Sequence, residues 1–230
     1  MRSRRSPWGY HAAVRILTVV PLVSIFSLSV ADAGAQVTVG AALVQSNQGT
    51  GASDRPYLGP GFGGTSIAGI GMVDVAVGSR VSVGGEISLA GNISGAQNER
   101  VPGGDNTFVS NHRDTVFSGV LKVGTPSNER VRAAAVIGGG LAQRHTDRNG
   151  TFNRSFLPLT STPVHETLSD VVLALTAGVD VAVGFTNHVA LLGTGRLYQL
   201  KDNDRRPDGV VQRGVSSTIL RYGGGLQIRF

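Results

Sequence analysis

The sequence alternates apolar and polar residues over most of its length, and this period of two constrains the fold more than any other feature. In residues 81–94, for example, Val83 and Leu89 share one parity and Glu86 holds the other. Side chains of a β-strand point alternately to its two faces, so the pattern predicts strands with one apolar and one polar face. No helical period competes with it, because even the alanine-rich stretch 131–142 contains three consecutive glycines.

Eight segments with this alternation are expected to be strands. They cover residues 37–46, 65–77, 81–94, 113–124, 130–145, 170–183, 189–200 and 217–230. They are longer than the roughly 5–6 residues usual in soluble strands and match what a tilted membrane-spanning strand needs. Long polar loops are expected at 47–64, 95–112, 146–169 and 201–216, and tight turns at 78–80, 125–129 and 184–188. Alternating loops and turns predict an antiparallel up-and-down order with both termini at the turn end.

Charged residues indicate which face meets lipid. Within most segments they avoid the apolar parity, with Arg113 as an exception, and small residues such as Gly84, Ser88 and Gly138 accompany them. A membrane barrel shows its apolar side chains to lipid and fills a narrow interior with small and polar ones. An unpaired backbone group in hydrocarbon costs on the order of several kcal/mol, so the last strand must pair with the first. The sequence therefore predicts an all-β fold, a closed antiparallel eight-stranded up-and-down transmembrane β-barrel.

Charged residues of the lumen are expected to form a structural network of ion pairs, because a buried charge without a partner is costly. The members are Asp74, Glu86, Lys122, Arg132, Asp180, Arg196 and Arg221. Folding across 95–112 predicts Glu86 beside Lys122, and folding across 201–216 predicts Arg196 beside Arg221. The two arginines then need an acid from across the lumen, either Glu86 or Asp74. The alternative is that these side chains lie in lumenal water and contact nothing.

The first 35 residues have a different character. They start with basic residues and no acid, continue with an apolar run at 16–30 and end in small residues. This order is typical of a secretory signal peptide, so we expect 1–35 to be the signal peptide and 36–230 the barrel domain. Cleavage after Ala33 is the alternative to cleavage after Ala35. An uncleaved anchor is disfavoured, because the run is shorter than about 20 residues and contains Pro21.

Composition excludes several classes of function. The chain has no cysteine, which excludes disulfides, cysteine-ligated zinc and thiol catalysis. Part of the net charge of +6 comes from the first 35 residues and the other bases are scattered, so no nucleic acid is expected as a partner. The histidines lack metal-binding spacing, and the glycine-rich stretch 59–64 lacks the strand and helix of a dinucleotide site. We expect a monomer without metal or cofactor.

The last strand carries a recognisable ending. Residues 222–230 read YGGGLQIRF, in which Tyr222, Leu226, Ile228 and Phe230 stand at alternate positions counted back from the end. This resembles the C-terminal assembly signal of bacterial outer-membrane barrels. With the signal peptide and eight segments, the chain resembles the small eight-stranded outer-membrane β-barrels of Gram-negative bacteria. The resemblance implies periplasmic termini, contact of the last strand with the barrel-assembly machinery, and surroundings of outer-membrane lipid and lipopolysaccharide.

The resemblance implies a structural or surface-interaction role with four extracellular loops and no open pore, because side chains fill so narrow a barrel. One alternative is an enzyme that modifies lipid A or phospholipid, which needs a nucleophile beside a histidine near the membrane rim. Two candidate sets exist for it: His165 with Glu166 and Ser169, and His145 with Ser155. A second alternative is a soluble, secreted, lipocalin-like barrel that holds an apolar ligand inside. We expect the non-enzymatic role and assign no catalytic residue.

Overall fold

The chain folds entirely as β-strands over the residues that the computed structural model describes, which are 36–50, 64–101, 103–126, 129–156, 159–201 and 217–230. Among them, no helix is long and apolar enough to cross a membrane. Val37–Phe230 forms one compact unit. The strands are β1 (Val37–Thr50), β2 (Gly64–Ala76), β3 (Val81–Ala90), β4 (Ile93–Val101), β5 (Gly104–Gly124), β6 (Val131–Arg154), β7 (Ser161–Gly184), β8 (Val189–Lys201) and β9 (Ser217–Arg229). The predicted signal peptide and much of the predicted loops 47–64 and 201–216 lie outside the described residues.

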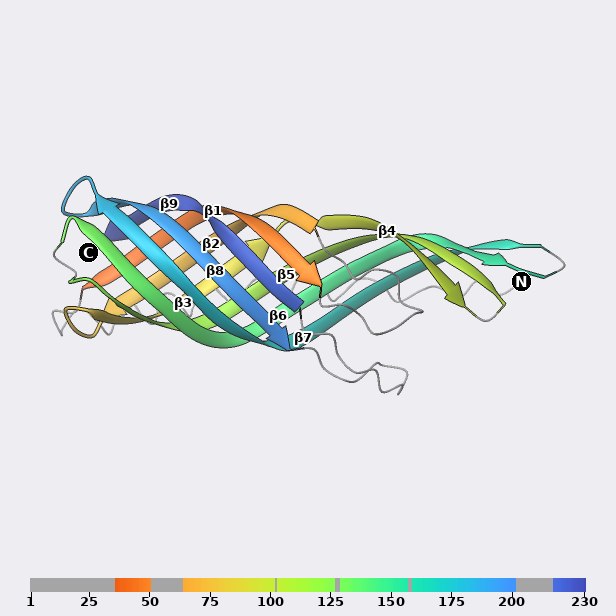
Figure 1. The fold of residues 1–230 in the computed structure, drawn as a ribbon, viewed down its shortest axis with the longest axis horizontal. Coiled ribbons are helices and arrows are strands. Elements are labelled where there is room, and N and C mark those ends of the chain that lie inside the picture. The colour runs from red at the N-terminus through yellow and green to blue at the C-terminus, as the bar shows by residue number, and fades with distance from the viewer. Residues whose placement is uncertain (1–35, 51–63, 102, 127–128, 157–158, 202–216) are drawn as a thin grey trace, which may run out of the picture. The chain divides into compact units, whose positions relative to one another are not determined.

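The strands form a closed antiparallel ring (Figure 1). Their order is β3-β2-β1-β9-β8-β7-β6-β5-β4, and an additional pairing of β3 with β5 closes the sheet. β3 and β4 pair with successive parts of β5, so together they make one wall strand. The ring therefore has eight wall strands, and the predicted closed eight-stranded barrel is confirmed.

The wall strand predicted at 81–94 is interrupted by a bulge. Leu89 is the partner of Thr115 and Ile93 is the partner of His112, so three residues on this strand face two on β5. An extra residue in one strand bends it and increases its local twist. The bulge shifts the register between the two halves of the wall strand, which alternation in the sequence does not reveal.

The two ends of the barrel unit lie together. β1 pairs with β9 from Thr38 and Arg229 to Thr50 and Ser217. The backbone N–H of Phe230 also donates to the carbonyl oxygen of Val37 at 2.8 Å. This end carries the connections from β2 to β3, from β5 to β6 and from β7 to β8, and it is called the tight-turn end below. Its position matches the prediction for the C-terminus and for the start of the first strand.

The strands are strongly tilted. Cross-strand partners followed once around the ring from Val37 return to β1 at Asn47, ten residues farther along. The path runs through Val37, Val75, Val83, Leu121, Ile137, Ala177, Leu197, Leu220 and Asn47. A stagger of this kind goes with a strand tilt of about 35–45°, and eight strands then leave an interior just wide enough for side chains.

Most outward side chains of the barrel wall are apolar, whereas the lumen holds buried charged side chains together with apolar ones such as Ile70 and Leu200. Leu226, Ile228 and Val83 expose 55, 45 and 43% of their surface, whereas Glu86 and Arg221 expose 5 and 0%. The predicted orientation of the two faces is confirmed. The inverse orientation, which the soluble lipocalin-like alternative requires, is contradicted by these side chains. The wall therefore presents the apolar outer surface that a bilayer demands.

Glycines on the two faces have different surroundings. A Cβ atom at inward Gly140 would collide with the carbonyl oxygen of Phe117, and one at inward Gly225 would collide with that of Ala41. At outward Gly85 a Cβ atom would meet only open space. The curved wall brings neighbouring backbones close together on its concave side, so closure itself requires the inward glycines.

Two hairpins continue as strands beyond the barrel, and the predicted loops at 95–112 and 146–169 are wrong. β4 and β5 pair as far as Val101 and Gly104, and β6 and β7 pair as far as Asn153 and Ser161. Beyond lipid both faces of a sheet meet water, so no apolar parity marks the strands although backbone pairing continues. We call this four-stranded part, residues 93–101, 104–112, 146–154 and 161–168, the extension.

Candidate functional site

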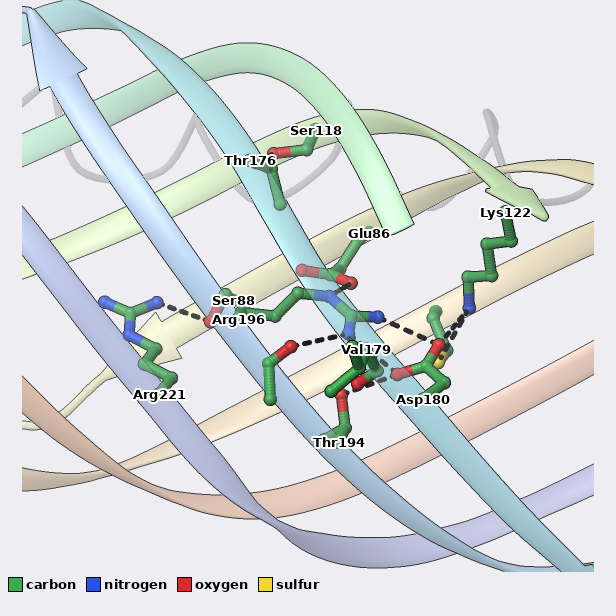
Figure 2. A network of polar contacts seen from close by, with 12 residues as sticks. Glu86, Ser88, Ser118, Lys122, Thr176, Val179, Asp180, Thr194, Arg196 and Arg221 are labelled. Carbon is green, nitrogen blue, oxygen red and sulfur yellow. Dashed lines mark hydrogen bonds and ion pairs between the residues drawn. The ribbon is translucent and has the colours of Figure 1, made fainter. Parts of the chain in front are cut away.

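Arg196 on β8 lies at the centre of the lumen and is fully buried (Figure 2). Its Nε donates to Glu86 Oε2 at 2.8 Å. Its Nη1 and Nη2 donate to Asp180 Oδ1 and Oδ2 at 2.7 and 3.0 Å. The planar guanidinium matches a carboxylate through two parallel hydrogen bonds, which gives this pair both strength and a fixed geometry. One side chain therefore ties together β3, β7 and β8.

Lys122 on β5 extends the same set of contacts. Its Nζ lies 2.7 Å from Asp74 Oδ2 and 2.8 Å from Asp180 Oδ2. The Thr194 hydroxyl donates to Asp180 Oδ1 at 2.8 Å. Asp180 is thus shared by two cations and one hydroxyl. We call Asp74, Glu86, Lys122, Asp180 and Arg196 the central network.

Arg221 on β9 is the cross-strand partner of Arg196, the position that folding across 201–216 predicts. It is satisfied mainly by neutral oxygen atoms. Its Nε donates to Ser46 Oγ at 3.2 Å, its Nη1 donates to Ser88 Oγ, and its Nη2 donates to the carbonyl oxygen of Asp114 at 3.3 Å. Of the two acids expected to serve the arginine pair, Glu86 contacts Arg196, whereas Asp74 contacts Lys122.

Tyr198 joins Arg221 to the central network, and sequence analysis did not single it out. Its hydroxyl donates to Glu86 Oε1 at 2.5 Å, and the Arg221 guanidinium lies 5.2 Å from the centre of its ring. A cation over an aromatic face is attracted by the ring quadrupole. Tyr198 stands two residues after Arg196 on the same inward face, so strand parity was the signal that could have found it.

Two expectations about the lumenal charges are wrong in detail. Glu86 is the partner of Ser118 and Lys122 is the partner of Ser82, so Glu86 and Lys122 are not opposite each other. The bulge in the wall strand and the continuation of the hairpin into the extension change the register that the expected loop implied. Arg132 does not join the central network, because its Nη2 donates to Gln227 Oε1 on β9 at 2.9 Å.

A second polar cluster, here called the upper cluster, lies inside the wall where the extension begins. His112 Nε2 lies 3.0 Å from Asp114 Oδ2, and His112 Nδ1 lies 2.8 Å from Thr146 Oγ1. Asp114 Oδ1 lies 3.4 Å from Arg144 Nε, and Gln48 Nε2 lies 3.3 Å from His112 Nε2. His112 belongs to the loop predicted at 95–112, and no sequence pattern indicated this cluster.

The lumen holds its charges in a balanced and hydrogen-bonded form. Three acids face three bases at its centre: Asp74, Glu86 and Asp180 against Lys122, Arg196 and Arg221. Buried charges are tolerated when they are paired and their remaining hydrogen-bonding groups are satisfied. Within the described part of the chain, no group of three His, Asp or Glu side chains is placed to hold a metal ion. The arrangement fits a filled, cross-linked lumen.

The residues considered for lipid chemistry lie on β6 and β7, except Ser155, which directly follows β6. His145 has Ser169 on β7 and Arg113 on β5 as cross-strand partners. Its Nε2 lies 3.2 Å from Asp147 Oδ2, and the Thr167 hydroxyl donates to Asp147 Oδ1 at 2.9 Å. That hydroxyl, with smaller effects of His145 and Arg113, holds the pKa of the exposed Asp147 carboxyl below its usual value of 3.8.

The structure regroups the two candidate sets for such an enzyme. Ser155 lies near the tip of the extension, where its N–H donates to the carbonyl oxygen of Gly103, far along β6 from His145. His165 contacts Asn149 and stands four residues from Ser169 on the same strand. His145 from one set therefore lies opposite Ser169 from the other.

Neither family models nor curated proteins match the sequence, whereas several solved structures are similar in fold. The attachment invasion locus protein Ail of Yersinia pestis, solved with the heparin analogue sucrose octasulfate, is 13% identical with a TM-score of 0.46 over 85% of this chain and 99% of that one. Neisserial surface protein A is 12% identical with a TM-score of 0.42, over 86 and 99%. The outer membrane protease OmpT of Escherichia coli is 9% identical with a TM-score of 0.47, over 85 and 96%.

Proposed function

We propose that this chain is an integral β-barrel of the bacterial outer membrane that anchors a four-stranded sheet at the cell surface, with a structural or surface-interaction role. The barrel wall supplies the anchor. Its outward side chains, such as Leu43, Leu175 and Leu226, are apolar and exposed. An outward apolar band on a closed barrel is stable in a bilayer, where every backbone group is paired within the wall.

The extension is the observation that carries the surface role. β4 pairs with β5 only, and residues 161–172 of β7 pair with β6 only, among the strands that the structure describes. Each of these two edges therefore presents backbone N–H and C=O groups along one side. An extended segment of another protein can add to such an edge as a further strand. We propose strand addition of this kind as the mode of interaction.

The filled lumen supports a role without an open pore. The central network joins β2, β3, β5, β7 and β8 through side chains that are almost fully buried. Water and ions would have to break these pairs to pass, and removing one partner of such a pair leaves a buried charge. The surface role is therefore favoured over conduction.

Labelling of introduced cysteines tests the proposed topology, because the natural sequence has none. Thr160 lies between β6 and β7 at the tip of the extension, and Ser79 lies in a tight turn at the opposite end. A membrane-impermeant maleimide added to intact cells should label Thr160→Cys and leave Ser79→Cys unlabelled until the outer membrane is permeabilised. Labelling of Ser79→Cys alone in intact cells would refute the orientation, and recovery of the protein in the soluble fraction would refute the membrane anchor.

We further propose that Tyr222, Leu226, Ile228 and Phe230 form the signal that the barrel-assembly machinery recognises. All four side chains are exposed on the outward face of β9 or at its end. Phe230→Ala should lower the fraction of the protein that reaches the outer membrane in heat-modifiable form. Phe185→Ala is the matched control, since Phe185 is an exposed aromatic residue in a turn at the same end. Equal assembly of both variants and the natural chain would refute the signal.

A lipid-modifying enzyme is the second candidate, and the pairing of His145 with Ser169 and Asp147 favours it. A histidine beside a hydroxyl, oriented by a carboxylate, is the arrangement that activates a serine nucleophile. Ser169→Ala should then abolish release of fatty acid from phospholipid or lipid A in micelles. Thr167→Ser, which keeps the hydroxyl that holds Asp147, is the control and should retain activity. Unchanged lipid composition in cells with and without Ser169→Ala would exclude this function.

A further inference from the structure

Two arginines at the tight-turn end of the lumen differ from every other inward cation described above. Lys122, Arg196 and Arg144 each contact a carboxylate, and Arg221 is surrounded by hydroxyl and carbonyl oxygens. Arg132 on β6 and Arg229 on β9 also belong to the inward face and are half-buried. No carboxylate of the described residues forms an ion pair with either of them.

Both arginines lie next to Gln227 on the inward face, although β6 and β9 are not neighbouring strands. Arg132 reaches over β7 and β8 to donate from Nη2 to Gln227 Oε1 at 2.9 Å. Gln227 and Arg229 stand two residues apart on the same face of β9, so this contact brings the two positive charges into mutual repulsion. The arginine crosses small side chains, because Ala182 on β7 is its own cross-strand partner and Ala190 on β8 is the partner of Gln227.

Arg229 leaves a hydrogen-bond donor unused. Its Nε is buried and has no acceptor among the described residues. A buried donor without an acceptor costs about 1–3 kcal/mol, and more when it belongs to a charged group. The nearest inward acids, Asp74 and Asp180, are already engaged by Lys122 and Arg196. Among the described residues, positive charge and donor capacity therefore remain uncompensated at this point.

We propose that Arg132 and Arg229, with the amide of Gln227, form a binding site for a phosphate group at the tight-turn end of the lumen. Guanidinium groups present pairs of N–H donors that match the oxygen atoms of phosphate. A bound phosphate dianion would compensate both charges at once and supply the acceptor that Arg229 Nε lacks. In the proposed orientation this end faces the periplasm, but the site itself does not depend on that orientation.

Thermal unfolding in neutral detergent micelles tests the site with inorganic phosphate as the probe. Chloride at equal ionic strength is the reference. A ligand that binds only the folded state raises its unfolding temperature in a saturable way. The natural barrel should show such a rise with phosphate, and Arg229→Gln and Arg132→Gln should each raise the dissociation constant by about tenfold or more. Arg80→Gln, in the exposed turn between β2 and β3, is the control and should bind as the natural chain does.

The arginine variants are expected to fold, because each substitution relieves repulsion between like charges. Without phosphate, Arg229→Gln should unfold at the same temperature as the natural chain or higher. Adding phosphatidylglycerol to the micelles in place of inorganic phosphate distinguishes a lipid headgroup from a free anion as the source. Equal unfolding temperatures in phosphate and chloride, or a phosphate effect that survives in the Arg132→Gln Arg229→Gln double variant, would overturn the proposal. Either result would leave the topology and surface role untouched.

Discussion

β6 passes through both the barrel and the extension, and its outward side chains differ between the two. From Val131 to Leu141 the outward side chains are small or apolar. From Gln143 to Asn149 the outward positions become polar or charged, yet pairing with both neighbouring strands continues without a break. The backbone conformation is the same in the two halves, and the solvent at the outer face is different.

This difference shows what alternation in a sequence reports. A period of two appears where one face of a strand meets an apolar medium and the other does not. In the extension both faces meet water, so backbone hydrogen bonds hold the strands without any apolar parity. The absence of alternation therefore marks the end of the apolar belt and not the end of the strand.

The largest expected difference between the two parts is the response to losing an arginine. Arg196→Met leaves Glu86 without its cation and Asp180 with Lys122 alone in the buried lumen, and it should lower the free energy of unfolding by about 3–5 kcal/mol. Arg154→Gln in the extension removes a cation that lies 4.3 Å from the centre of the Phe156 ring. This contact is at the surface and should be worth less than about 1 kcal/mol. Urea unfolding in lipid vesicles measures both values, and equal losses would show that the lumenal pairs are not buried.

A charge introduced on the outer face tests where the apolar belt ends. Leu175 on β7 is 66% exposed in the belt, and Val109 on β5 is 54% exposed in the extension. Leu175→Arg should cost about 2–4 kcal/mol, as a cation does near the middle of a bilayer, whereas Val109→Arg should cost less than about 1 kcal/mol. The same unfolding assay applies. A large cost at Val109 would place the extension in lipid and would contradict the proposed change of solvent along the strands.

Glycine substitutions compare the concave and convex sides of the wall. Gly140→Ala drives a Cβ atom into the Phe117 carbonyl oxygen and should cost about 1–3 kcal/mol. Gly85→Ala faces open space and should be neutral or gain up to about 1 kcal/mol, because alanine loses less conformational freedom on folding. Refolding yield and unfolding free energy measure the pair. Equal tolerance at both positions would mean that closure does not require the inward glycines.

The smallest effect concerns acidity at the base of the extension. The Thr167 hydroxyl depresses the pKa of Asp147, so this contact stabilises the hairpin above the ordinary carboxyl range and is lost as the pH falls through the lowered pKa. Amide hydrogen exchange of β6 and β7, corrected for intrinsic rates, should therefore accelerate in acid. Thr167→Val removes the donor and should shift this acceleration to higher pH. An unshifted pH dependence of the exchange rates would show that the contact between Thr167 and Asp147 does not stabilise the hairpin.

The barrel was predictable from the sequence because alternating apolar and polar residues, which let its wall face lipid on one side, can be recognised along the chain. All eight wall strands, their antiparallel order and the outward position of residues such as Leu226 follow from alternation and from the placement of charges. The meeting of Arg196 with Arg221 also follows, because it depends on one hairpin register without a bulge.

The remaining features depend on information that alternation does not contain. The bulge before Ile93 and the position of the turn beyond Val101 together set the register that separates Glu86 from Lys122. The upper cluster was missed because His112 lies where apolar parity has ended. The position of Arg132 depends on a contact across the lumen with Gln227, which no spacing along the chain encodes.

A spin-label scan along β6, one introduced cysteine at a time from residue 131 to 154, measures where the outer face of the strand passes from lipid to water. Accessibility to oxygen, which concentrates in acyl chains, should oscillate with a period of two and peak at odd positions through Leu141. Beyond about residue 145 the oscillation should vanish, and a water-soluble relaxation agent should reach labels of both parities. Peaks at even positions, or an oxygen oscillation that continues to residue 153, would contradict the account.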